Sequence, residues 1–485
     1  MPARCIAIFK HGRRRQRGAA LLIILVLLLV GIAAVLINSL TATAAKNARQ
    51  AHTAAVLAQA KDALIGFAVT YGDTHSDQVP GYLPCPDTDG NNGLQSEGVG
   101  EYGTSSCNSS PSSNQDVSVI GRLPWKTLDL SDLRDGDGEC LWYAVSGTYK
   151  NNPPTGLMNW DTDGQFLAFA ADGTPPGNQV VAVIFAPGAP LSGQSQNRSP
   201  DNTAPICGGN YTASNYLDHG TVNGNNFDNA NVTAGVFIQG TSGGTINDQM
   251  VFITRQDIWN AVQKRTDFKS TDPNINPLRK LTDKVADCLV KYANNNTCWS
   301  CSSNDSLPWP APLALSDYSD KTKYNDSSGL YAGRVPYDVG TSAGSHNSLT
   351  TLMNATSCGS GWTASVDAWW TNWKDQLFYG LAGDFYPTNG GGQHCGVAPC
   401  LSLDGGSQVY AGVVMFAGPR FSSQNRTTKS DVTQYLEGSN ATNVTGPNPP
   451  TNGNENYQSA STTINDVLCT IYFNSSTSTF SVNCP

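Results

Sequence analysis

The chain carries two copies of one set of short segments, and both copies keep the same order along the sequence. Independent matches rarely preserve their order over several segments, so the pattern predicts a tandem duplication. A duplicated chain has to fold twice into the same unit, which restricts the fold more than any single motif does. The matching segments are 83–86 (LPCP) and 307–310 (LPWP), 121–125 and 333–337, 141–149 and 377–385, 181–199 and 411–428, 216–218 and 435–437, and 245–248 and 463–466 (TIND in both).

Each copy is predicted to be a module of the α+β class, with a helix packed on an antiparallel sheet. Apolar residues recur at helical spacing in 56–71 and 278–292, and short apolar runs typical of strands follow each helix. The expected strands are 180–186 and 250–254 in the first copy, and 409–417 and 469–473 in the second. Abundant Gly, Asn, Ser and Thr, with only 14 % charged residues, favour short strands and many turns. The expected organisation is a first module over 72–264 that ends in a helix at 256–264, a linker over 265–277, and a second module over 278–485.

The N-terminal segment differs from the rest in charge and hydropathy. Residues 1–18 hold six basic residues and no acidic one, and Ala19 to Ile37 is a 19-residue run without a charge. As a helix this run would be about 28 Å long, which is enough to cross a bilayer. The basic cluster before it would remain in the cytoplasm. Because no Pro follows as far as Tyr71, the sequence predicts one long helix over 19–71 whose first part spans the inner membrane.

A basic leader that ends in Gly, followed by a small residue and an apolar helix, resembles the type IV prepilin family, which includes the type II secretion pseudopilins. The resemblance covers residues 1–55 and implies that prepilin peptidase cleaves between Gly18 and Ala19, with Ala19 becoming the methylated first residue. Major pilins have Glu at the fifth mature position, where this chain has Ile23. The chain is therefore most similar to large minor subunits at filament tips, because a buried Glu in a membrane helix needs a partner, such as the N-terminus of a preceding subunit.

The resemblance implies a function, a location and partners. It implies a non-enzymatic minor pilin or pseudopilin with two pilin-head-like modules, which passes once through the inner membrane and has its C-terminal region in the periplasm. Its partners would be the inner membrane, prepilin peptidase and other pilin or pseudopilin subunits. At the cell surface or the tip of a pilus or secretion pseudopilus, it would initiate assembly or contact a surface.

Two other interpretations of the N-terminus stay open. Ala42, Thr43 and Ala44 fit the small-residue rule for signal peptidase, which would release a secreted protein. The helix could also remain uncleaved as a plain anchor. The modules would then form a membrane-tethered adhesin or binding protein that does not join a filament.

The cysteines indicate an oxidising compartment. There are 13, and setting aside Cys5 in the leader leaves an even number, with four in the first module and eight in the second. Plausible pairs are Cys85–Cys107, Cys140–Cys207, Cys395–Cys400 and Cys469–Cys484, although sequence does not fix connectivity. Cys298 and Cys301 are expected to form a structural disulfide. The alternatives are a redox pair, or a zinc site completed by His394, Cys395 and Cys400.

Acidic loops in the first module are candidate calcium sites. Asp87, Asp89 and Asn91 alternate oxygen ligands, Asp135, Asp137 and Glu139 do so again, and Asp161 and Asp163 form a shorter case. Calcium takes six to eight oxygen ligands from flexible Gly-containing turns, and a structural calcium is the single cofactor considered. Neither long loop has Gly at the sixth position or a closing Glu at the twelfth, so ordinary Asp/Asn/Gly turns are the alternative.

No catalytic residue is assigned. Residues 340–344 match the G-x-S-x-G pattern, and Ser342 would be the nucleophile of a tethered hydrolase, but the match lies in a polar insertion without the strand and helix that the motif needs. Without the leader, 23 basic residues face 38 acidic ones, and such a balance repels nucleic acid. The tryptophans at 369, 370 and 373 are expected to pack the core of the second module.

Overall fold

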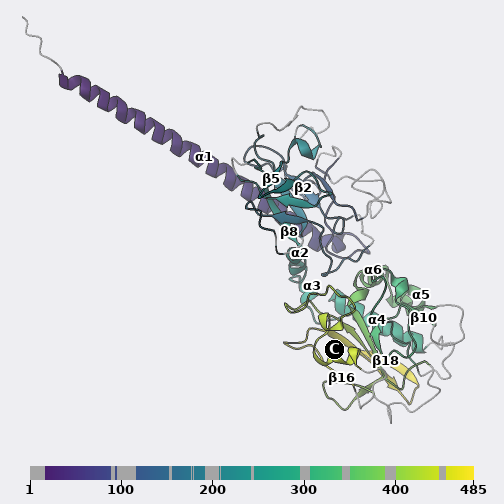
Figure 1. Ribbon diagram of the computed structural model, residues 1–485. Coiled ribbons are helices and arrows are strands. Elements are labelled where there is room, and N and C mark those ends of the chain that lie inside the picture. The colour runs from purple at the N-terminus through teal and green to yellow at the C-terminus, as the bar shows by residue number, and fades with distance from the viewer. Residues whose placement is uncertain are drawn as a thin grey trace, which may run out of the picture.

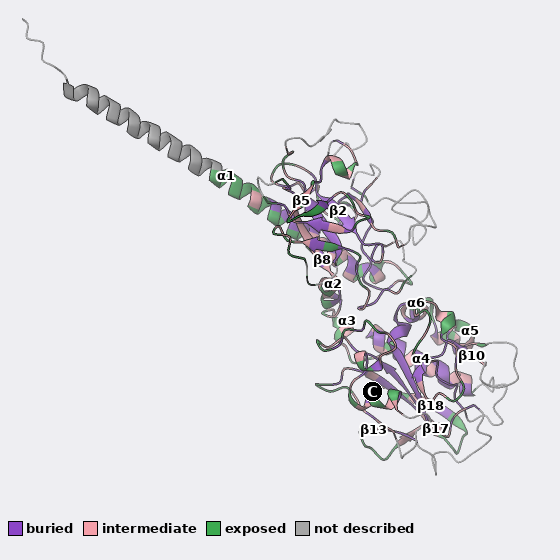
Figure 2. Ribbon diagram, in the orientation of Figure 1, coloured by how far each residue is buried: buried purple, intermediate pink, exposed green. Residues whose placement is uncertain are grey.

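The computed structural model describes residues 17–88, 93–94, 116–151, 156–175, 177, 180–191, 207, 209–241, 245–294, 306–340, 350–387, 400–446 and 455–484, with side chains from residue 43 onward. Over these residues the fold is mixed α and β, with several sheets and disulfides. Figure 1 shows two modules, with helix α1 leading into the first and helices α2 and α3 between them. Figure 2 shows that the central strands of both modules are buried.

The first module packs one long helix against a four-stranded sheet. Helix α1 (Arg17–Thr74) buries Val56, Ala60, Leu64 and Ala68, which lie on one face because each is four residues from the next. The antiparallel sheet has the order β1-β2-β4-β8, and a parallel pair β3–β7 and a hairpin β5–β6 complete the module. The strands are β1 (Val119–Arg122), β2 (Trp142–Val145), β3 (Leu167–Phe169), β4 (Val180–Ala186), β5 (His219–Val222), β6 (Asn225–Asp228), β7 (Val236–Ile238) and β8 (Gln249–Thr254).

Strand β4 is buried along its whole length because both faces of the sheet are covered. Ala182 and Ile184 belong to the core that includes the buried residues of α1. Val183 and Phe185 alternate with them and belong to a second core with Phe237 of β7. The continuous apolar run at 180–186 therefore follows from a three-layer module.

Two short helices connect the modules and are tied to the end of α1. Helix α2 (Arg255–Val262) begins with a capping box between Thr254 and Asp257, and Asp257 also pairs with Lys61 of α1 at 3.1 Å. Helix α3 (Thr266–Lys269) follows, and Arg265 before it pairs with Asp73 at 2.8 Å. The predicted linker is thus partly helical and is fixed to the first module.

The second module packs helix α4 (Pro277–Asn294) against a sheet of order β9-β12-β15-β17-β18. Its remaining helices are α5 (Ala355–Cys358), α6 (Ala364–Trp373) and α7 (Gly438–Thr445). Its strands are β9 (Ala332–Arg334), β10 (Asp338–Val339), β11 (Thr350–Thr351), β12 (Leu377–Leu381), β13 (Leu401–Leu403), β14 (Val409–Tyr410), β15 (Gly412–Phe416), β16 (Glu455–Tyr457), β17 (Val467–Asn474) and β18 (Thr479–Asn483).

The repeated segments lie on corresponding strands of the two sheets. Strands β1, β2 and β4 overlap the segments that β9, β12 and β15 overlap in the second module, and β8 and β17 directly follow the two TIND segments. Neighbouring strands pair in the same order. The parallel pair β3–β7 has its counterpart in β13–β16. Side chains agree as well, since the hydroxyls of Tyr143 and Tyr379 each donate to a proline carbonyl of the matching LPCP or LPWP segment, both at 3.2 Å.

The expected helix at 278–292 and the expected strands at 180–186, 250–254 and 469–473 are present, and the remaining expected strand shows one informative difference. The run at 409–417 is divided at Ala411, because Val409 and Tyr410 pair with β13 whereas Gly412 onward joins the main sheet. Trp370 and Trp373 on α6 are fully buried, as expected.

The prediction of a membrane-spanning helix is wrong for the part of the chain that the structure describes, where no helix is both long enough and apolar enough to cross a bilayer. Residues 43–74 of α1 carry charges at Lys46, Arg49, Lys61, Asp62 and Asp73, which a membrane interior would not accommodate. Residues 19–37 lie within α1, and their side chains are outside those described.

Disulfides link distant parts of each module. Cys140–Cys207 and Cys469–Cys484 are among the pairs considered from the sequence, whereas Cys288–Cys358, which ties α4 to α5, was not. Cys85 and Cys400 are also disulfide-bonded. Cys107, Cys298, Cys301 and Cys395 lie outside the described residues.

Replacing Cys288 and Cys358 together by Ala is expected to lower the free energy of unfolding of the second module by about 2–5 kcal/mol, because the bridge restricts a long loop in the unfolded chain. The sequence separation of this bridge is 70 residues. Thermal unfolding monitored by near-UV circular dichroism measures the effect. The matched replacement of Cys140 and Cys207 tests a bridge of the first module in the same way. An unfolding transition that is unchanged in the Cys288 and Cys358 variant would contradict the prediction.

Candidate functional site

Each module buries one arginine among aromatic rings. The Arg122 guanidinium lies 5.1 Å from the ring centre of Trp142 and 4.8 Å from that of Tyr216. In the second module the Arg334 guanidinium lies 4.2 Å from Phe378 and 5.2 Å from Tyr435, at the equivalent positions. Burial lowers the pKa of Arg122 from its usual value, while Tyr216 opposes this effect. These cages hold the first strand of each sheet against its closing loops.

Each module also buries a pair of carboxyl groups beside an asparagine. Oδ2 of Asp248 accepts hydrogen bonds from the backbone N–H of Asp218 at 2.7 Å and from the side chain of Asn229 at 2.9 Å. The side chain of Asn229 also forms two hydrogen bonds with the backbone of Ile238 in β7. Its amide nitrogen donates to the Ile238 carbonyl, and its amide oxygen accepts from the Ile238 N–H. The second module repeats the arrangement with Asp466, Glu437, Asn440 and Gln458 in these places.

Burial raises the pKa of one member of each carboxyl pair. Burial raises the pKa of Asp466 to about 8, and the neighbouring Glu437 adds to this, while the hydrogen bond from Asn440 opposes it. Burial likewise raises the pKa of Asp248 well above its usual value, and Asp218 contributes. These pairs link the strand ends of each module through hydrogen bonds.

The two modules meet where residues 157–163 of the first module enter the second, a contact that we call the junction. Trp160 is buried there, with its ring edge-on to Trp373 of α6 at a centroid distance of 4.6 Å and to Phe416 of β15 at 5.7 Å. Trp259 of α2 is also edge-on to Trp373, at a centroid distance of 5.5 Å. Edge-to-face contacts of this kind stabilise aromatic clusters beyond the area that they bury.

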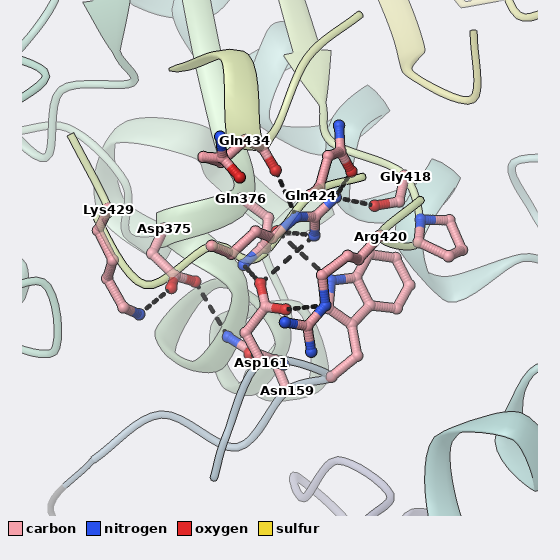
Figure 3. A network of polar contacts seen from close by, with 12 residues as sticks. Asn159, Asp161, Asp375, Gln376, Gly418, Arg420, Gln424, Lys429 and Gln434 are labelled. Carbon is pink, nitrogen blue, oxygen red and sulfur yellow. Dashed lines mark hydrogen bonds and ion pairs between the residues drawn. The ribbon is translucent and has the colours of Figure 1, made fainter. Parts of the chain in front are cut away.

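Asp161, the next residue, enters a pocket of cationic and amide groups (Figure 3). Its carboxylate pairs with Arg426 at 3.3 Å and accepts a hydrogen bond from Gln376 at 2.8 Å, and Arg420 approaches to 4.0 Å. The Asp161 side chain is 5 % exposed and that of Arg426 is not exposed at all. Arg426 also donates to the carbonyl of Gly418 at 2.7 Å. Burial raises the pKa of Asp161, while Arg426 acts in the opposite direction.

Asn159, on the other side of Trp160, completes the junction. Its amide donates to Asp375 at 3.0 Å and to the carbonyl of Asn372 at 2.8 Å, and Asn372 accepts from the N–H of Met158 at 2.9 Å. Asp375, which is fully buried, also pairs with Lys429. The ring of Trp160 and several paired polar groups thus fix the junction. Such an arrangement is suited to hold two modules in one orientation.

The sequence-predicted site residues do not come together in one place. The Asp135 carboxylate accepts N–H bonds from Asp137 (2.9 Å), Glu139 (3.0 Å) and Gly188 (2.8 Å), as turn-forming aspartates do. Asp87 accepts from the N–H of Gly93 at 2.9 Å. The calcium sites stay a prediction, and Asp89, Asn91, Ser342 and His394 lie outside the described residues.

Sequence reasoning missed the role of Asp161 and found no signal for the junction. The sequence did mark Asp248 and Asp466, which end the repeated TIND segments, and Arg122 and Arg334, which follow the repeated glycines. Their roles were not recognised because charged residues in a repeat are equally consistent with solvent-exposed turns.

Comparison of the chain with models of known families, with curated proteins and with solved structures gives no match in any of the three.

Replacing Trp160 by Ala is expected to lower the free energy of unfolding by about 3–5 kcal/mol, because it leaves a cavity between Trp373 and Phe416. The two modules should then unfold in separate transitions, which differential scanning calorimetry would resolve. Trp125→Ala, at a half-buried tryptophan away from the junction, is the matched control and should not separate them. One unchanged transition in Trp160→Ala would show that the coupling of the two modules does not depend on Trp160.

Loss of the proton from Asp466 is expected to lower the free energy of unfolding as pH rises. The folded protein keeps this proton up to about pH 8, whereas the unfolded chain loses it near the ordinary value of 3.8. The contribution of Asp466 to the free energy of unfolding is complete below pH 3.8 and is lost progressively as pH rises to about 8. Asp466→Asn, which mimics the protonated form, should flatten the dependence in urea titrations at a series of pH values. An equal slope in wild type and Asp466→Asn would contradict the assignment.

Proposed function

We propose that the protein is a non-enzymatic structural subunit that joins an assembly of the type IV pilin kind through α1 and carries its two modules as one head. The observation that carries this proposal is the course of α1. From Thr53 onward its inner face is buried in the first module, whereas residues 43–49 are exposed (Figure 2). We propose that equivalent helices of neighbouring subunits pack along the part of α1 that leaves the module.

The junction supports the same proposal. A subunit whose head stands at the outer surface of a filament requires two modules that keep one orientation relative to each other. Trp160 and Asp161 supply that stiffness, and the disulfides add to it outside the cytosol. Two modules on one helix form a bulky head, which favours a place at the end of a filament over every step along it.

The proposal is tested by N-terminal mass spectrometry of the protein from cells with and without prepilin peptidase. The expected mature chain begins at Ala19, is N-methylated and depends on that peptidase. Gly18→Asp should block processing, because the peptidase requires the small residue before the cut. Ala44→Leu is the matched control, since it disrupts the signal-peptidase pattern and should leave processing unchanged. A chain that begins at Ala45, or an intact N-terminus in all strains, would contradict the proposal.

A further inference from the structure

The two modules differ in the chain that follows their matching segments 216–218 and 435–437. In the first module this chain forms the hairpin β5–β6, whereas in the second it forms helix α7. A groove of about 660 Å³ lies beside α7, between the helix, the segment after β15 and the segment before β17. The second module lies at the end of the molecule opposite the N-terminal part of α1 (Figure 1). The groove therefore belongs to the module that α1 does not enter.

The floor of the groove is apolar. It is formed by Leu436, which is 2 % exposed, and by Ala441, which is 7 % exposed. The half-buried Phe421 is the one aromatic residue among the described residues that line the groove. These side chains offer a small apolar surface to one face of a bound ring.

Helix α7 presents two oriented hydroxyl groups to the groove. Thr442 and Thr445 are exposed, and each donates its hydroxyl hydrogen to the helix carbonyl four residues earlier, at 3.1 and 3.0 Å. These bonds fix the two side chains and leave their oxygens as acceptors. A ligand that donates from hydroxyl groups therefore meets acceptors that are already in place.

The other walls of the groove add hydroxyl groups that are both donors and acceptors. Ser422 and Ser423 lie after β15, Thr462 lies before β17, and all three are exposed. Their hydroxyls form no hydrogen bond with any residue that the structure describes. A serine or threonine hydroxyl donates one hydrogen bond and accepts two, so these walls match a ligand whose edge consists of hydroxyl groups.

Glu437 is the one charged residue among the described residues that line the groove. Its Oε1 accepts a hydrogen bond from the side-chain amide of Gln424 at 2.8 Å, and its Oε2 accepts from the N–H of Asn465 at 3.0 Å. Both donors are neutral, and each carboxylate oxygen has a further lone pair for a ligand hydroxyl. Because no described Lys or Arg lines the groove, it has nothing to pair with a phosphate, a sulfate or an acidic sugar.

We propose that this groove binds a neutral carbohydrate. A pyranose ring carries C–H groups on its faces and hydroxyl groups around its edge. Its face would lie on Phe421, Leu436 and Ala441, and its edge would bond to the threonines of α7 and to Glu437. This binding activity goes beyond the role of a structural subunit and does not depend on it, because the groove lies in the second module and α1 takes no part in it.

The experiment titrates the purified full chain with maltotriose, cellotriose and triacetylchitotriose by isothermal titration calorimetry. At least one of these neutral probes is expected to bind saturably, with an affinity that does not fall as salt rises, because no ion pair forms. Phe421→Ala should weaken binding about tenfold, because it removes the aromatic part of the floor. Thr442→Trp should abolish binding, because the indole fills the groove from the exposed face of α7.

The matched control is Thr70→Trp on α1. Thr70 is exposed, and its hydroxyl donates to the carbonyl four residues earlier at 3.0 Å, as that of Thr442 does. Thr70→Trp should leave the affinity unchanged, and all variants should keep the wild-type unfolding temperature.

Failure of every neutral probe to bind would overturn the proposal. Binding that neither Phe421→Ala nor Thr442→Trp weakens would overturn it too, since the sugar would then occupy another place. Polygalacturonate serves as the acidic probe, and binding of it in preference to the neutral probes would show that the groove is not selective for neutral sugars and would also overturn the proposal.

Discussion

The arrangement of the two modules depends on Trp160 and Asp161 of the first module entering the second. The indole ring supplies most of the favourable free energy, because it removes a large apolar surface from water between Trp373 and Phe416. The ion pair between Asp161 and Arg426 contributes little net stability, since desolvation of both charges offsets their attraction. The ion pair instead fixes the orientation of the two modules, because a buried carboxylate tolerates only the orientation in which its partners reach it.

The same division between apolar burial and polar positioning recurs inside each module. Apolar side chains on both faces of β4 and β15 form the cores, while a buried arginine and a buried carboxyl pair fix the loops at the strand ends. Both devices occur at equivalent positions in the two modules. Buried polar groups are costly unless every partner is present, so duplication had to copy the partners together.

Much of the fold could be predicted from the sequence, because apolar periodicity and repeated segments are local signals. The helix at 278–292 and the strand at 180–186 are examples. The junction could not be predicted. Asp161 lies 265 residues from Arg426, and no local pattern distinguishes a buried aspartate in D-T-D from a solvated turn or a calcium loop. The predicted membrane-spanning helix relied on the apolar run at 19–37, and in the part of the chain that the structure describes no helix is both long and apolar enough to cross a bilayer.

The two modules differ in the side chains at one strand end. Phe416 and α6 build an aromatic wall in the second module, and the first module supplies the ring that fills it. At the corresponding place the first module has Ala186, and the side chains beside it come from α1, from the turn at Asp135 and Asp137 and from the segment after β4. The difference in size between Ala186 and Phe416 therefore accompanies a difference in what lies beside each strand end, which is α1 in the first module and Trp160 in the second.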